Sequence, residues 1–301
     1  MNLPELMKNY NCDEDCRAYL EKLRWPNGPV CAKCGGKDIT RIGGRSEVLR
    51  CKECEHQFTV TVGSVFQDSH LPLTKWFMAT YLICEAKKGI SALQIQRTLG
   101  IGGYKTAWHL CHRIRHAMMV TDSQPLTGTV EMDETYVGGK SHGKRGRGAF
   151  GKEIVIGIRQ RNGELRLFHV SDVTSGTLAK YIKENISKDV EVLITDDFSS
   201  YRTAVGVIGG KGKHMTINHS SHVHTDGAIH TNTIESAFSL LKRGIIGSWH
   251  RISAKHLASY CNEMCFRFNQ RNNPALFSLT LCRLLEADTL TFDRLTGKKA
   301  A

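Results

Sequence analysis

The sequence lacks the features of a membrane or secreted protein. No run of about 18 apolar residues occurs in its 301 residues, and a membrane-spanning helix requires such a run. The opening residues, MNLPELMKNYNCDEDC, lack the basic start and apolar stretch of a signal peptide. We therefore expect a cytoplasmic protein without a membrane partner.

Acidic residues are scarce relative to basic ones. Lys and Arg total 41 against 29 Asp and Glu, which gives a formal net charge of +12, and 14 His are present in addition. A basic excess of this size favours a polyanionic partner, because each neutralised phosphate releases condensed counterions. No basic amphipathic helix or lipidation motif is present, so nucleic acid is favoured over a membrane surface.

The cysteines do not form a disulfide pattern. Their number is odd, 11, and no secretory signal accompanies them, which favours metal ligation and packing thiols. Two Cys-x2-Cys pairs separated by 16 residues suit one structural Zn²⁺ in a zinc ribbon, with the ligands Cys31, Cys34, Cys51 and Cys54. A redox role is not expected, because no βαβ pattern surrounds the pairs. Cys12 and Cys16 have helical spacing, which favours packing thiols over a second metal site.

Three helices are predicted after the zinc ribbon, over residues 75–89, 91–100 and 103–119. The second has a serine at its cap position and ends at a glycine, and the third is basic. This pattern is typical of a DNA-binding helix-turn-helix, although three-helix bundles without a DNA partner share it. The predicted DNA contacts on the third helix are Lys105, Arg113 and Arg115.

A polar, proline-containing break over residues 121–129 is the predicted boundary of a second region. Beyond it the patterns predict the order βββαβαβα, with a hairpin at Asn162-Gly163. A meander followed by crossovers gives a mixed sheet flanked by helices, which is an α/β fold.

Acidic side chains occupy three informative places in this region. Asp133 lies inside the first strand, Asp196 ends a mostly apolar strand, and Glu235 lies on the polar face of a helix over residues 230–244. That face also carries Asn232 and Lys242. Converging carboxylates suit Mg²⁺ or Mn²⁺, and two such ions support in-line displacement at phosphorus. Taken singly, each could instead be a satisfied strand acid, a helix cap or a solvated face.

Two further segments are basic or rich in histidine. The loop over residues 138–152 has five Lys or Arg in 15 residues, which favours contact with the DNA backbone through Lys144, Arg145 and Arg147. The histidines of INHSSHVHTDGAIH match no known zinc-ligand spacing, so phosphate contact or exposure is favoured for His219, His222, His224 and His230. The apolar stripe over residues 257–268 predicts core packing.

Several stretches together resemble the bacterial insertion-sequence transposases that join a zinc ribbon and a helix-turn-helix to an RNase H-like DDE (Asp-Asp-Glu) domain. The matching stretches are RWPNGPVCAKCGG, SALQIQRTLGIGGYKTAWHLCHRIR, VEMDETYVGGK, ITDDFSSYR, HTNTIESAFSLLKRGIIGSWHRIS and YCNEMCFRFNQR. The resemblance covers roughly residues 16–271. It implies an N-terminal helix and zinc ribbon over 1–70, a helix-turn-helix region over 71–122, an RNase H-like catalytic domain over 123–290 and a tail over 291–301.

The resemblance also implies roles for individual residues. Asp133 and Asp196 match the first two catalytic aspartates, and Glu235 or Asn232 matches the third metal ligand, with Glu235 preferred because a carboxylate holds a divalent cation better than an amide. Lys242 then contacts DNA, and we expect the same of Arg243.

The predicted protein is a DNA transposase that binds the terminal inverted repeats of an insertion sequence. It would cleave and join strands with two Mg²⁺ or Mn²⁺ ions, and would act as a homo-oligomer on paired ends of double-stranded DNA. One alternative is a zinc-ribbon and helix-turn-helix transcription regulator without catalysis. Another is a structure-selective nuclease of similar fold.

Overall fold

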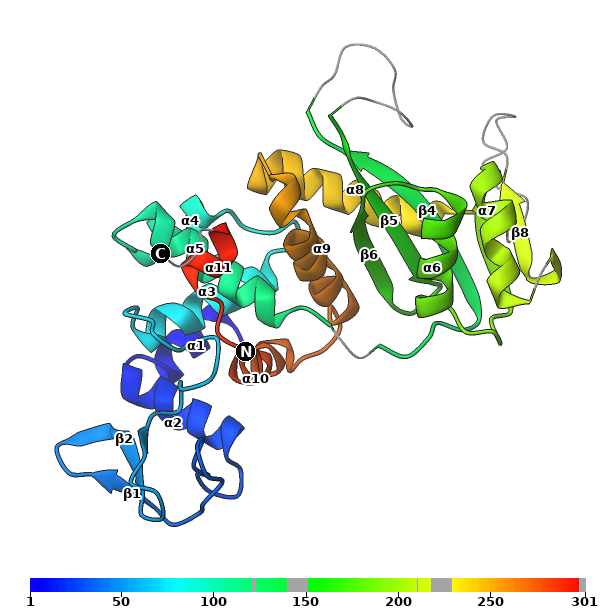
Figure 1. Ribbon diagram of the computed structural model, residues 1–301. Coiled ribbons are helices and arrows are strands. Elements are labelled where there is room, and N and C mark those ends of the chain that lie inside the picture. The colour runs from blue at the N-terminus through cyan, green and yellow to red at the C-terminus, as the bar shows by residue number, and fades with distance from the viewer. Residues whose placement is uncertain (121–122, 140–150, 210, 218–228, 298–301) are drawn as a thin grey trace. The chain divides into compact units, whose positions relative to one another are not determined.

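The computed structural model describes residues 1–120, 123–139, 151–209, 211–217 and 229–297. The chain forms two compact units (Figure 1). The first combines Met1–Met119 with Asn272–Ala301, and the second is Val120–Arg271. Each unit has its own buried core.

The first unit begins with helices α1 (Leu3–Asn9) and α2 (Asp13–Arg24), followed by a small antiparallel sheet. Among the described residues this sheet has the order β1-β2-β3, with β1 (Ile39–Ile42), β2 (Arg45–Cys51) and β3 (Gln57–Phe58). Its core is only Cys31, Leu49, Cys51 and Phe58, with a few partly buried apolar neighbours. A core of this size gives little stability without a further constraint.

The predicted helix-turn-helix is present in the first unit. Helices α3 (Leu73–Glu85), α4 (Ala92–Leu99) and α5 (Tyr104–Ala117) follow the sheet. The Ser91 hydroxyl accepts a hydrogen bond from the Gln94 amide and so caps α4. Gly100 ends α4 in the left-handed conformation, with φ of 58°, which glycine adopts without strain. Helices α4 and α5 pack against each other after this turn.

The C-terminal helices also belong to the first unit. Helix α10 (Leu276–Glu286) packs against α2, α3 and α5, and α11 (Phe292–Thr296) follows it. The ring of Phe277 lies 5.7 Å from that of Phe77, and the Val65 amide donates to the Leu284 carbonyl. The expected division had placed residues up to 290 in the α/β domain. The apolar face of α10 instead completes the helical core, and helical periodicity alone does not indicate which core a helix joins.

The second unit contains the predicted mixed sheet. Within its described residues the strand order is β6-β5-β4-β7-β8. β4 pairs antiparallel with β5 and β5 with β6, whereas β4 pairs parallel with β7 and β7 with β8. The strands are β4 (Thr129–Val137), β5 (Glu153–Gln160), β6 (Leu165–Val170), β7 (Val192–Asp196) and β8 (His214–Ile217).

Helices cover both faces of this sheet (Figure 1). On one face α6 (Ser175–Asn185), α7 (Ser199–Ala204) and the 3₁₀ turn η1 (Val205–Ile208) form a core with β4 and β5. A second 3₁₀ turn, η2 (Lys211–Lys213), precedes β8. On the other face lie α8 (Asn232–Gly244), its π-helical continuation η4 (Ile245–Trp249) and α9 (Ala254–Asn269). The element order therefore confirms the predicted βββαβαβα arrangement.

Alternation along the strands decides which side chains meet α8. Val130 and Met132 of β4 face the α6 core, so Glu131 and Asp133 project to the opposite face. Gly157 of β5 pairs with Asp133, and a Cβ atom there would lie 2.6 Å from Ile234 Cδ1 and 2.7 Å from Phe238 Cε1. The missing side chain at Gly157 thus lets α8 lie close to the sheet beside Asp133.

Among the helices of the described residues, none is both long and apolar enough to cross a membrane.

Candidate functional site

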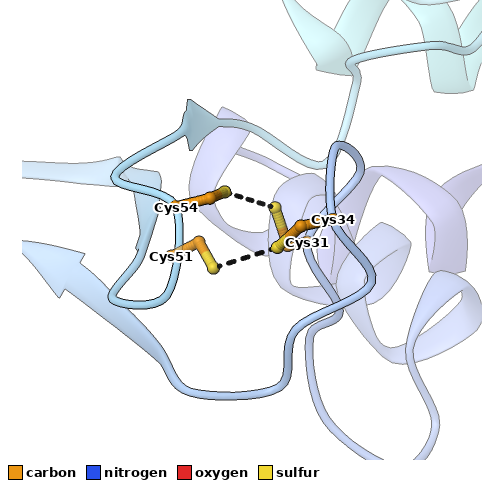
Figure 2. Close-up of side chains that lie close together, drawn as sticks. All are labelled: Cys31, Cys34, Cys51 and Cys54. Carbon is orange, nitrogen blue, oxygen red and sulfur yellow. Dashed lines mark hydrogen bonds between the residues drawn. The ribbon is translucent and has the colours of Figure 1, made fainter.

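Four cysteine thiols converge from two loops in the first unit (Figure 2). The Sγ atoms of Cys31 and Cys54 are 3.6 Å apart, as are those of Cys34 and Cys51. A tetrahedral zinc ion with Zn–S distances of about 2.3 Å requires S–S distances of about 3.8 Å. The four predicted cysteines therefore lie as ligands of a structural zinc site would.

The two loops have matching backbone conformations. In the first, the Gly35 amide donates to the Cys31 carbonyl, and in the second the Glu55 amide donates to the Cys51 carbonyl. Gly35 and Glu55 both have positive φ, 76° and 59°. In the first loop the Lys33 and Gly36 amides point at the sulfurs of Cys31 and Cys34, each at 3.4 Å. Such donors stabilise thiolates, which are the form that binds zinc.

Cys12 and Cys16 lie apart from this cluster. The Cys12 thiol donates to an Asp15 carboxylate oxygen at 3.1 Å, and Cys16 is fully buried in α2. Burial raises the pKa of the Cys16 thiol to about 12, because the thiolate would lose its solvation. Cys16 is therefore a packing thiol.

An acidic cluster lies at the edge of the mixed sheet where β7 ends. Carboxylate oxygens of Asp133, Glu134 and Asp196 all lie within 4.8 Å of one another. The parallel pairing of β4 with β7 explains this, because Glu131 is level with Ile194. Two residues further along each strand, Asp133 and Asp196 reach the same level. The sequence prediction that these two aspartates meet is thus realised in the fold.

The cluster has the electrostatics of a cation site. Burial raises the pKa of Asp133 well above its ordinary value, and the neighbouring carboxylates of Glu134, Asp196 and Glu235 raise it further. The Glu134 amide, which donates to Asp133 Oδ1 at 2.8 Å, opposes this shift. Carboxylates so close together repel unless a proton or a cation lies among them, and oxygen donors suit Mg²⁺ or Mn²⁺.

Glu134 was not among the predicted ligands. Adjacent residues of a strand face opposite sides, so strand alternation alone does not place Glu134 in the same site as Asp133. The Tyr201 hydroxyl donates to Glu134 Oε2 at 3.0 Å, which fixes that carboxylate from the α7 side. The signal available in the sequence was the Asp-Glu pair itself, inside a strand of otherwise mostly apolar and uncharged residues.

Glu235 lies in the first turn of α8, next to the cluster but outside its 4.8 Å group. Its carboxylate is near enough to raise the pKa of Asp133, and it accepts a hydrogen bond from the Thr231 hydroxyl at 2.9 Å. Asn232, the other predicted third ligand, begins α8 and is also exposed. Lys242 and Arg243 are exposed in the last turn of the same helix.

The predicted DNA contacts on α5 require a correction. Arg113 and Arg115 are buried, with 5% and 1% of their surface exposed. The Arg113 guanidinium lies over the Trp76 ring and donates to the Gln67 carbonyl. The helical pattern could not separate a basic surface from arginines that pack inside a helical bundle.

Lys105 is exposed near the start of α5, as is Tyr104. The Lys105 ammonium lies 4.1 Å from the centre of the Phe292 ring, beside a cavity of about 460 Å³ that Arg113 also lines. Lys144, Arg145 and Arg147 fall outside the described residues, as do His219, His222 and His224. His230 is half-buried beside Arg161.

The sequence is similar to known proteins in both of its units. Residues 125–269 match the ISXO2-like transposase domain family, and residues 11–57 match a transposase zinc-ribbon domain. The chain is therefore similar to transposases in both its zinc ribbon and its α/β unit. It is similar to the "Uncharacterized protein in transposable element ISH50" of Halobacterium salinarum, with 26% identity over 288 residues, covering 87% of this chain and 92% of that protein.

Proposed function

We propose that the protein is a DDE-type DNA transposase that cuts at the ends of its element and joins the resulting 3′-hydroxyl to target DNA. The observation that supports this most is the meeting of Asp133 and Asp196, which are far apart in the sequence, beside Glu235. Two divalent cations, Mg²⁺ or Mn²⁺, held by Asp133, Asp196 and Glu235 would activate water or the 3′-hydroxyl and neutralise charge at the phosphate.

The residues around the cluster would place the DNA. Glu235, Ser239 and Lys242 are exposed along one face of α8. A DNA strand that follows this face would therefore pass the acidic cluster first and the basic side chains at the end of the helix after it. Lys242 and Arg243 would hold the backbone phosphates, which positions the scissile bond without reading its sequence. Glu134, fixed by Tyr201, adds a further acidic oxygen donor on the opposite side of Asp133.

The first unit would supply recognition of the element ends. A zinc ribbon and a helix-turn-helix precede the α/β unit, and the start of α5 exposes Tyr104 and Lys105. In a helix-turn-helix the N-terminal residues of the second helix contact base edges. We place the reaction in the cytoplasm, on a homo-oligomer that pairs two ends, because strand joining needs both ends together.

Substitutions at the start of α8 test this proposal and identify the third ligand. Glu235→Gln is expected to abolish cleavage and joining of a DNA carrying the element's own ends, while leaving end binding unchanged, because it removes a charge that the cation requires. Asn232→Ala, three residues away on the same exposed face, is expected to stay within about tenfold of the wild-type rate. Cleavage assays with Mg²⁺ and gel-shift assays on the same DNA measure both effects.

Each other outcome has a definite meaning. Full cleavage by Glu235→Gln together with an inactive Asn232→Ala would assign the third position to Asn232. Full cleavage by both variants would remove α8 from the site. Cutting of branched DNA without any joining would identify a structure-selective nuclease, and binding without metal-dependent cutting would identify a regulator.

A further inference from the structure

We propose that Glu131 is a positioning residue of the active site: it fixes the first turn of α8 to β4 and so sets the distance between Asp133 and Glu235. This inference rests on the proposed function, since it concerns the same metal site. Glu131 itself would touch neither cation nor DNA. It would act through the helix that carries the third ligand.

Both oxygens of the Glu131 carboxylate are engaged. The side chain is completely buried. Its Oε2 accepts hydrogen bonds from the Thr233 amide at 2.9 Å, the Thr233 hydroxyl at 2.7 Å and the Ile234 amide at 3.0 Å. Its Oε1 accepts from Arg161 Nε at 2.7 Å. Although it is a carboxylate close to the acidic cluster, Glu131 therefore has the partners of an anchor and not those of a metal ligand.

The start of α8 depends on this distant carboxylate. The residue at the cap position, Thr231, makes no side-chain hydrogen bond to the first amides of the helix. Its hydroxyl instead donates to Glu235 Oε1 at 2.9 Å. The amides of Thr233 and Ile234 would be without partners in a buried setting, and Glu131 supplies the acceptor. A negative charge at this end also interacts favourably with the helix dipole.

Two arginines, Arg159 in β5 and Arg161 in the hairpin after it, also bind the start of α8 and the residues before it. Arg161 Nη2 donates to the His230 carbonyl at 2.9 Å, and Arg159 Nη1 donates to the Thr233 carbonyl at 2.9 Å. The ion pair between Glu131 and Arg161 thus links β4, the hairpin after β5 and the residues that lead into α8. It also balances the Glu131 charge, which would otherwise add to the repulsion around Asp133.

The sequence spacing makes this anchor effective. Glu131 and Asp133 are two residues apart on one strand and project to the same face. Thr233 and Glu235 are two residues apart at the start of one helix. The contact between Glu131 and Thr233 therefore joins two rigid elements immediately beside the place where Asp133 and Glu235 must share a cation. A shift of about 1 Å at such a site costs on the order of a hundredfold in rate.

The test compares Glu131→Gln with a matched control, Glu263→Gln, in the full-length protein. Glu263 of α9 is equally buried, and its carboxylate is paired with Arg267 at 3.1 Å. Glutamine keeps the size of Glu131, but its amide group must face either the helix amides or Arg161, both of which are donors. Both variants lose a buried ion pair, and only the first loses the anchor of α8.

Two measurements are made on each protein. The first is the Mn²⁺ concentration that gives half-maximal cleavage, and the second is amide hydrogen exchange at Thr233 and Ile234. Glu131→Gln is expected to raise the Mn²⁺ midpoint about tenfold and to speed exchange at both amides, while end binding is retained. Glu263→Gln is expected to leave the midpoint within twofold of wild type, whatever its effect on the melting temperature.

The inference is overturned if Glu131→Gln keeps the wild-type midpoint, or if Glu263→Gln raises it equally. Asp133→Asn serves as the reference for the proposed function. If that variant cleaves DNA with the wild-type dependence on Mn²⁺, the metal site itself is wrongly placed and the role of Glu131 is lost with it. An unchanged midpoint in Glu131→Gln alone overturns only the positioning role.

Discussion

Asp196→Asn is expected to lower the rates of strand cleavage and joining about 10³-fold or more, whereas Asp197→Asn is expected to keep both rates. The two residues are adjacent, but only Asp196 belongs to the acidic cluster with Asp133 and Glu134. Asp197 pairs with Arg202 at 2.5 Å. The asparagine at 196 keeps an oxygen that can accept from the Phe198 amide, as Asp196 Oδ1 does at 3.2 Å, so the local turn is preserved.

The same substitution is expected to stabilise the metal-free protein. The charge of Asp196 contributes to the raised pKa of Asp133. A carboxyl group whose pKa is higher in the folded state than in the unfolded state lowers the stability of the fold at neutral pH, because the unfolded state ionises there without the same cost. Removing one of the repelling neighbours relieves part of this penalty, so the melting temperature of the metal-free protein is expected to rise.

Cleavage assays and thermal melts in EDTA and in Mn²⁺ measure these effects. Wild type is expected to gain stability on adding Mn²⁺, and Asp196→Asn is expected to gain little. If Asp197→Asn were the inactive variant, or if Asp196→Asn cut DNA normally, the assignment of the second aspartate would be incorrect.

The second large effect concerns the zinc ribbon. Cys54→Ser is expected to lose bound zinc, to unfold the β1–β3 sheet and to reduce specific end binding by at least about 100-fold. The ribbon core contains four buried side chains, two of which are the proposed ligands Cys31 and Cys51. Structural zinc contributes about 10–16 kcal/mol of binding free energy in small domains of this kind, so its loss exceeds what such a core can supply.

Cys12→Ser provides the control, because its thiol contacts Asp15 and not the cluster. It is expected to keep one zinc per chain by elemental analysis and to bind DNA as wild type does. Cys54→Ser is expected to retain the melting transition of the α/β unit, which has a separate core. Loss of zinc from Cys12→Ser, or normal end binding by a zinc-free Cys54→Ser, would contradict the assignment.

Features of the fold and site that depend on a local sequence pattern could be predicted from the sequence. Four cysteines in two short loops allow one tetrahedral arrangement, and Figure 2 shows them converging as expected. The polar face predicted for the helix over residues 230–244 is exposed in α8, and the opposite face is buried at Ile234, Ala237 and Leu241. Asp196 could be placed because carboxyl ends of parallel strands gather at one edge of a sheet.

The sequence was insufficient where a long-range contact decides the role of a residue. A basic helix face does not show that Arg113 stacks on Trp76 inside the bundle, nor that α10 joins the helical core. Glu131 and Glu134 are both carboxylates near Asp133, and the sequence offers either as a metal ligand. In the structure Glu131 accepts hydrogen bonds from the start of α8, whereas Glu134 joins the acidic cluster. Only the packing of α7 and α8 on β4 separates these roles.

The central claim is that Asp133, Asp196 and the start of α8 together bind divalent cations. Anomalous X-ray scattering from crystals of the full-length protein grown with Mn²⁺ tests it most directly. We predict an anomalous peak about 2 Å from carboxylate oxygens of both Asp133 and Asp196, with Glu235 turned toward the metal. Crystals with Mn²⁺ bound elsewhere and no peak between these two aspartates would contradict the account.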